Sequence, residues 1–133
     1  MKVNEVMLSL DKFPVIREDL FFKEAIDVMN EKKLGIACIV DQNHHLKGIL
    51  TDGDIRRKLL KVQKPLSALF VDDCIDHAIL APTVTFPEAT LNEAVDIMEK
   101  KQIWDLPVVD SLGKLVGLLH LHPVVQALLN EKK

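Results

Sequence analysis

Thr51 and Asp54 stand where an apolar stretch meets a basic one, in the run GILTDGDIRR at positions 48–57. A hydroxyl followed three residues later by a carboxylate has the spacing of a capping box, in which two side chains satisfy free N–H groups of a helix's first turn. The same turn suits a ligand, because a helix start attracts phosphate and a carboxylate accepts hydrogen bonds from sugar hydroxyls. Both interpretations stay open, and they are compatible.

Arg56 and Arg57 begin a basic cluster that continues through Lys58 and Lys61. A basic run is ordinarily the solvated face of a helix. This cluster, however, adjoins the position at which a phosphate would bind, and guanidinium groups bind phosphate well. Ligand contact and plain solvation therefore remain equally open for the two arginines.

His120 and His122 are two residues apart, so on a strand both rings would lie on one face and could hold a metal ion. Two ligands do not complete a site, which favours polar lining of a second cleft or a helix start. No serine or cysteine nucleophile has a histidine base at a recognisable spacing, and no paired carboxylates follow an apolar cleft motif. We expect no catalytic residue, no metal site and no resident cofactor. The remaining histidines, His44, His45 and His77, are expected to be exposed to solvent.

The composition is that of an ordinary globular domain, with 133 residues, 48% of them hydrophobic and 28% charged. A net charge of −3 argues against a nucleic-acid partner. The apolar runs are too short to span a membrane, and the N-terminus has no signal-peptide pattern. Cys38 and Cys74 have no metal-ligand spacing and are expected to be free thiols. These features predict a soluble, cytoplasmic protein.

Hydrophobic periodicity predicts an amphipathic helix from Phe22 to Lys32 or Lys33, which Gly35 would end. Two strands, 36–40 and 46–50, should follow as a hairpin, and then a helix over 53–61. The pattern then starts again. Glu24–Met29 superposes on Glu93–Met98, an offset of 93 − 24 = 69 residues that continues through Gly48 and Gly117 without a gap. The chain is therefore a tandem repeat.

The repeat predicts an α+β fold of two units, each ordered strand, helix, strand, strand, helix. The first repeat would occupy residues 1–61, a linker residues 62–74, and the second repeat residues 75–133. A unit of about 60 residues has little core of its own. We therefore expect the two repeats to pack face to face about a pseudo-two-fold axis.

This element order and the run at positions 48–54 resemble the CBS domain, the cystathionine-β-synthase repeat that works in pairs called Bateman modules. The resemblance implies a site for an adenosine-type nucleotide, in which Asp54 takes the ribose hydroxyls and Thr51 helps to hold ribose or phosphate. The base would need an apolar slot. The candidates for it in the same repeat are Val15, Ile16, Gly35, Ile36 and Ala37.

Residues 48–57 and 116–122 are similar to the C-terminal CBS pair of bacterial D-arabinose-5-phosphate isomerases, which serve lipopolysaccharide or capsule synthesis. The resemblance implies a regulatory module, not an enzyme, whose partner is a sugar-isomerase domain in cis or in trans. Its ligand would be an adenine nucleotide or a cytidine nucleotide-sugar. The alternative is a structural dimerisation module with no ligand.

The second repeat departs from the family pattern, because His120 stands where Thr51 does and Pro123 where Asp54 does. Proline offers neither a carboxylate for ribose nor a backbone N–H for phosphate. We therefore expect one strong nucleotide site in each chain. The resemblance also implies a homodimer, for which the apolar helix positions are Ile55, Leu59, Leu60, Val124, Leu128 and Leu129.

Overall fold

The computed structural model describes residues 1–131 and divides the chain into two compact units. One, here named the Thr51 unit, comprises residues 11–82. The other, named the Trp104 unit, combines residues 1–10 with the chain from residue 83 onward. None of the helices within residues 1–131 is both long enough and apolar enough to cross a membrane.

The Thr51 unit is built on a four-stranded sheet in the order β1-β2-β3-β4. Its strands β1 (Val15–Arg17) and β2 (Ile36–Val40) are parallel, whereas β3 (Leu46–Thr51) is antiparallel to both β2 and β4 (Ile79–Leu80). The predicted hairpin between β2 and β3 is confirmed.

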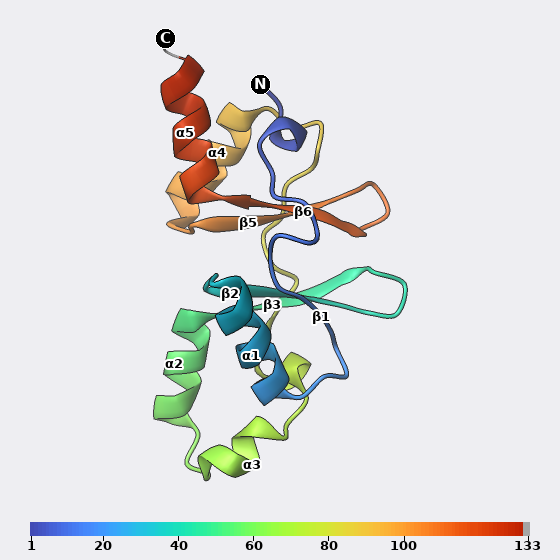
Figure 1. Ribbon diagram of the computed structural model, residues 1–133, viewed down its shortest axis with the longest axis vertical. Coiled ribbons are helices and arrows are strands. Elements are labelled where there is room, and N and C mark those ends of the chain that lie inside the picture. Colours follow the sequence, from blue (N-terminus) through green and yellow to red (C-terminus); the bar gives the residue numbers. More distant parts are fainter. Residues whose placement is uncertain (132–133) are drawn as a thin grey trace. The chain divides into compact units, whose positions relative to one another are not determined.

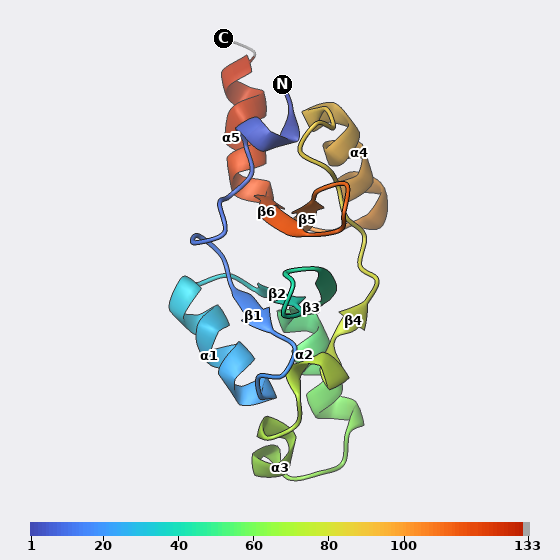
Figure 2. The ribbon, with the colours of Figure 1, turned by 90° about the vertical axis from the view of Figure 1, so that its right-hand side faces the viewer.

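Helices α1 (Phe22–Lys32) and α2 (Asp52–Lys61) lie on the same side of this sheet (Figures 1 and 2). In α1, Phe22, Ala25 and Met29 are buried at spacings of three and four, as the periodicity predicts. The helix ends at Lys33, which has a left-handed backbone (φ 57°) and donates its N–H to the Met29 carbonyl. The expectation that Gly35 ends this helix is therefore wrong.

The segment expected to be a linker, 62–74, carries a short helix, α3 (Leu66–Phe70), and is followed by the 3-10 helix η2 (Cys74–His77). Leu69 and Cys74 are buried in the same core as α1 and β2. Neither Cys38 nor Cys74 forms a disulfide. Burial raises the pKa of the Cys74 thiol to about 11, which makes it a poor nucleophile at neutral pH.

His77 is buried, with 8% of its surface exposed, so the expectation of a solvent-exposed ring is wrong. Its Nε2 lies 2.8 Å from Asp72 Oδ2, and its ring centroid lies 4.7 Å from that of Phe22. The same carboxylate oxygen lies 2.8 Å from Lys64 Nζ. Hydrogen bonds from Lys64 and His77 hold the pKa of Asp72 below its usual value. His77 is buried because the preceding segment, 62–74, folds against the core of the unit and brings the residues that follow it inward.

The Trp104 unit repeats this architecture with β5 (Asp105–Val109) and β6 (Leu115–His120), which are antiparallel. Helices α4 (Leu91–Lys101) and α5 (Leu121–Glu131) lie together on one side of these strands (Figure 1). Thr85 makes a parallel bridge to Val108, at positions 69 residues beyond the pair Ile16 and Ile39 of the first sheet.

The leading segments of the two repeats are exchanged between the units. Val3, in the 3-10 helix η1 (Val3–Glu5), has no exposed surface and packs in the core of α4, β5 and β6. Leu8 and Leu118 exchange two backbone hydrogen bonds, of 2.7 and 3.1 Å. Conversely, β4 comes from the start of the second repeat and pairs with β3. The compact units therefore do not coincide with the sequence stretches 1–61 and 75–133.

This exchange predicts where a core mutation at the N-terminus acts. Val3→Ala should destabilise the protein by roughly 1 to 3 kcal/mol, because it leaves a cavity in a buried apolar site. Hydrogen exchange followed by mass spectrometry should show lost protection in α4, β5, β6 and α5, although Val3 belongs to the first repeat. The matched variant Cys74→Ala should instead loosen α1 and β2. Loss of protection in residues 11–82 on Val3→Ala would contradict the exchange.

Candidate functional site

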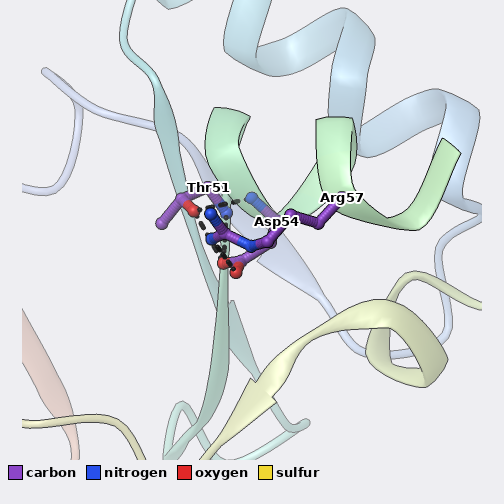
Figure 3. A network of polar contacts seen from close by, with 3 residues as sticks. All are labelled: Thr51, Asp54 and Arg57. Atoms are coloured by element: carbon purple, nitrogen blue, oxygen red, sulfur yellow. Dashed lines mark hydrogen bonds and ion pairs between the residues drawn. The ribbon is translucent and has the colours of Figure 1, made fainter. Parts of the chain in front are cut away.

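Thr51 and Asp54 form the predicted capping box at the junction of β3 and α2 (Figure 3). The Asp54 N–H donates to Thr51 Oγ1 at 3.2 Å, and the Thr51 N–H donates to Asp54 Oδ2 at 3.3 Å. The Thr51 hydroxyl also donates to Asp54 Oδ2, at 2.6 Å. The capping role is therefore confirmed, and it uses one of the two carboxylate oxygens.

The other carboxylate oxygen, Asp54 Oδ1, accepts a hydrogen bond of 2.8 Å from Arg57 Nη2. Arg57 lies one helical turn further on and reaches back over the start of α2 (Figure 3). Arg56 is exposed and makes no contact with Asp54 among the hydrogen bonds and ion pairs of the described residues. Burial raises the pKa of Asp54, but hydrogen bonds from Thr51 and Arg57 outweigh it and leave the pKa below its usual value. The site thus holds an ionised carboxylate beside a guanidinium.

Two of the proposed slot residues share a sheet face with Thr51. Ile36 of β2 pairs with Thr51 of β3. Val15 of β1 pairs with Cys38, which lies two positions after Ile36 on β2. Alternation along β2 therefore places Val15, Ile36 and Thr51 on one face. By contrast, Ile16 and Ala37 are on the other face and pack in the hydrophobic core, with 3% and 0% of their surface exposed. The Ile36 side chain is buried as well, with 1% of its surface exposed, so of these four residues only Val15 offers exposed side-chain surface to a slot, which corrects that expectation.

Gly35 is exposed, but its lack of a side chain is explained by Asp52. A Cβ at Gly35 would lie 2.6 Å from Asp52 Oδ2, and the Asp52 N–H donates to the Gly35 carbonyl at 3.0 Å. Gly35 also lines a groove of about 430 Å³ between α1 and α2, together with Asn30, Lys33 and Asp52. Neither Thr51 nor Asp54 lines this groove, but the hydrogen bond from Asp52 places the Gly35 backbone beside the capping box.

The second repeat has a different polar pair at the equivalent junction. His120 Nδ1 lies 2.6 Å from Asp105 Oδ1, directly across strands β5 and β6. Burial raises the pKa of Asp105, and the hydrogen bond with His120 offsets this only in part. Sequence reasoning missed Asp105, although the hairpin register pairs it with His120 just as Ile36 pairs with Thr51.

His122 does not share a strand face with His120. It is the second residue of α5 and is exposed, whereas His120 ends β6. The geometry assumed for a two-histidine metal site is therefore absent. Within residues 1–131, no three His, Cys, Asp or Glu side chains are grouped so that they could hold a metal ion.

Comparison with known proteins identifies relatives of both repeats. The family model described as CBS domain matches residues 3–61 and 79–130. An uncharacterized protein of Helicobacter pylori (strain J99 / ATCC 700824) is 35% identical over 128 residues, 95% of this chain. Arabinose 5-phosphate isomerase KdsD of Escherichia coli (strain K12) is 28% identical over 127 residues, 96% of this chain. The chain spans 37% of the length of each of these two relatives.

The crystal structure of CBSX2 in complex with AMP is similar in both sequence and fold. It is 27% identical to this chain, has a TM-score of 0.85, and the match covers 99% of this chain and 98% of that one. CBSX2 is a CBS-pair protein from Arabidopsis thaliana.

The lowered pKa of Asp54 predicts how its contribution to stability depends on pH. A carboxylate whose pKa is depressed by folding stabilises the protein above its unfolded pKa, and this stabilisation is lost as the pH falls through the folded pKa. Asp54→Asn should therefore lower the free energy of unfolding by about 1 kcal/mol at pH 7. The difference from the unmodified protein should shrink below about pH 4.

Urea unfolding at pH 7, 5 and 3 measures this difference. Asp76→Asn, an exposed position on η2 in the same unit, is the control and should have a smaller effect. An effect of Asp54→Asn that is the same at pH 7 and pH 3 would show that the ionised carboxylate contributes nothing.

Proposed function

We propose that this chain, which belongs to the CBS domain family, is a regulatory module that binds a nucleotide at the start of α2. The observation that carries the proposal is the ionised Asp54 carboxylate, held by Thr51 at a helix start whose partial positive charge suits a phosphate. The sequence and fold similarity to CBSX2, a protein crystallised with AMP, supports AMP as the first candidate ligand.

Each part of an adenine nucleotide has a candidate partner in the Thr51 unit. The ribose hydroxyls would donate to the Asp54 carboxylate in charge-assisted hydrogen bonds. The phosphate would lie at the first turn of α2, near Arg56 and Arg57. The base would lie against Val15 on the sheet face that it shares with Thr51, and the buried residues Ile16, Ile36 and Ala37 would contribute only backbone.

The module would control a sugar-phosphate isomerase. Its support is the 28% identity to arabinose 5-phosphate isomerase KdsD, of whose length the chain spans 37%. A sugar-isomerase domain in cis or in trans would supply the chemistry, in the cytoplasm, for lipopolysaccharide or capsule synthesis. A cytidine nucleotide-sugar formed later in such a pathway is the alternative ligand to an adenine nucleotide, because it would act as a feedback signal.

Calorimetric titration of the purified chain tests nucleotide binding. AMP should bind at one site per chain, and Asp54→Ala should weaken binding by about 2 to 3 kcal/mol, the loss of a charged hydrogen bond. The same variant should lose only about 1 kcal/mol of stability from its helix cap. Unchanged affinity in Asp54→Ala would leave Asp54 with the capping role alone. Two equal sites would contradict the inequivalence of the repeats.

The alternative function, a structural dimerisation module, is favoured by exposed apolar side chains on both units. Leu59 and Leu60 on α2 are 48% and 78% exposed, and Leu129 on α5 is 58% exposed. Val124, which was expected to take part, is only 1% exposed and belongs to the core. Trp104 is 71% exposed and lines an apolar groove of about 400 Å³ between α4 and α5. We propose that these faces hold a homodimer.

Light scattering at micromolar concentration should therefore give twice the monomer mass of 15.0 kDa. Trp104→Ala with Leu129→Glu should shift the protein toward the monomer, because a charge on an apolar contact must be desolvated. Glu131→Gln, at a charged position near the end of α5, should leave the dimer intact. A monomer mass for the unmodified chain would contradict the proposal. A dimer that binds none of the adenine, guanine or cytidine nucleotides would favour the structural module.

A further inference from the structure

We propose that Arg57 makes the nucleotide site selective for phosphorylated nucleosides. Its guanidinium is hydrogen-bonded to the Asp54 carboxylate and would leave it only to bind a phosphate. The inference rests on the proposed function and concerns the same site.

Both oxygens of the Asp54 carboxylate are engaged before any ligand arrives. Oδ2 accepts from the Thr51 hydroxyl at 2.6 Å and from the Thr51 N–H at 3.3 Å, whereas Oδ1 accepts from Arg57 at 2.8 Å. An ionised carboxylate offers about four lone pairs. Thr51 uses two of them and Arg57 a third, so a ribose diol that donates two hydrogen bonds to Asp54 needs the one that Arg57 holds. The contacts with Thr51 belong to the cap of α2, so the Arg57 contact is the one that can be released without opening the helix.

The two partners differ in their exposure to solvent. The Arg57 side chain is 55% exposed, and the Asp54 side chain is only 12% exposed. An ion pair with a half-exposed arginine is screened by water, so it contributes little free energy and can be broken at low cost. Occupation of Oδ1 by Arg57 should therefore weaken the binding of an uncharged nucleoside by a small factor.

The guanidinium already lies where a phosphate would bind. A Cβ at Gly53 would be 3.1 Å from Arg57 Nη2 and 3.2 Å from Nη1, which places the group against the first turn of α2 (Figure 3). A helix start carries partial positive charge, so it disfavours a cation and attracts an anion. A phosphate at this turn would pair with the guanidinium through two parallel hydrogen bonds. A guanidinium that turns from Asp54 toward this phosphate would leave Asp54 Oδ1 free to accept a hydrogen bond from ribose.

The second repeat has lost both partners together. The 69-residue offset places Pro123 at the position of Asp54 and Gln126 at that of Arg57. An arginine whose role depends on the carboxylate is expected to be absent where the carboxylate is absent. The joint replacement supports a paired role in the first repeat.

Calorimetric titration of the full chain with adenosine and with AMP tests the inference. Arg57→Gln should bind adenosine about three to five times more tightly, because Asp54 is no longer occupied. It should bind AMP at least about ten times more weakly, because the phosphate loses its bidentate partner. Lys23→Gln, which breaks an exposed ion pair with Asp27 on α1 of the same unit, is the matched control and should leave the ratio of the two affinities unchanged. Circular dichroism checks that each variant is folded.

The opposite responses to adenosine and AMP distinguish this role from a structural one. If Arg57→Gln weakens both ligands by the same factor, or changes neither, the exchange of partners is wrong while nucleotide binding stands. If Arg57→Gln weakens adenosine, Arg57 helps rather than blocks the nucleoside, which also overturns the inference. If neither the unmodified chain nor any variant binds adenosine or AMP, the binding of adenine nucleotides itself is refuted, and the inference falls with it.

Discussion

The exchange of leading segments is the constraint on which both units depend. Each unit pairs one edge of its hairpin with a segment from the other repeat, since Leu8 bridges to β6 and β4 pairs with β3. A two-stranded hairpin alone is marginally stable in water, and its unpaired strand edge leaves backbone N–H and C=O groups without partners. The borrowed segment pairs that edge and adds a buried side chain such as Val3 to the core. At Gly117, a Cβ would lie 2.9 Å from the Leu8 carbonyl oxygen, so a glycine is needed there.

The second feature that organises the molecule is the double role of Asp54. Its Oδ2 completes the cap of α2, and its Oδ1 faces Arg57 and the first turn of the helix. A carboxylate fixed on one side and exchangeable on the other is well suited to a ligand site, because the helix cap orients it before binding. Preorganisation of this kind lowers the entropic cost of recognition. Structure and proposed function therefore use different oxygens of one side chain.

The two repeats share an architecture but differ in the chemistry of their equivalent positions. The junction of β3 and α2 has Thr51, Asp54 and Arg57, whereas the junction of β6 and α5 has His120 bonded to Asp105 and a proline in place of the carboxylate. The grooves between the paired helices differ in the same way. The groove in the Thr51 unit includes Lys33 and Asp52, and the one in the Trp104 unit is almost entirely apolar. Duplication has preserved the core and altered the surfaces.

The sequence by itself determined the features that depend on neighbours within a few residues. The tandem repeat, the longer helices, the hairpin strands and the Thr51–Asp54 capping box all follow from periodicity and from contacts three or four residues apart, whereas α3 lies in the expected linker. The pairing of Asp105 with His120 could also have been predicted from the sequence, because the two strands of a hairpin are neighbours along the chain and their register follows from the turn between them.

Only the tertiary structure decided the features that depend on long-range partners. It placed Val3 in the core of the second repeat, buried His77 beside Asp72 and Phe22, and turned Ile16 and Ala37 into the core instead of a ligand slot. Alternation along a strand separates two faces but does not say which face meets the helices. No local sequence pattern marks the places where the chain passes from one unit to the other. The stability gained by this passage comes from contacts between segments that are distant in the sequence.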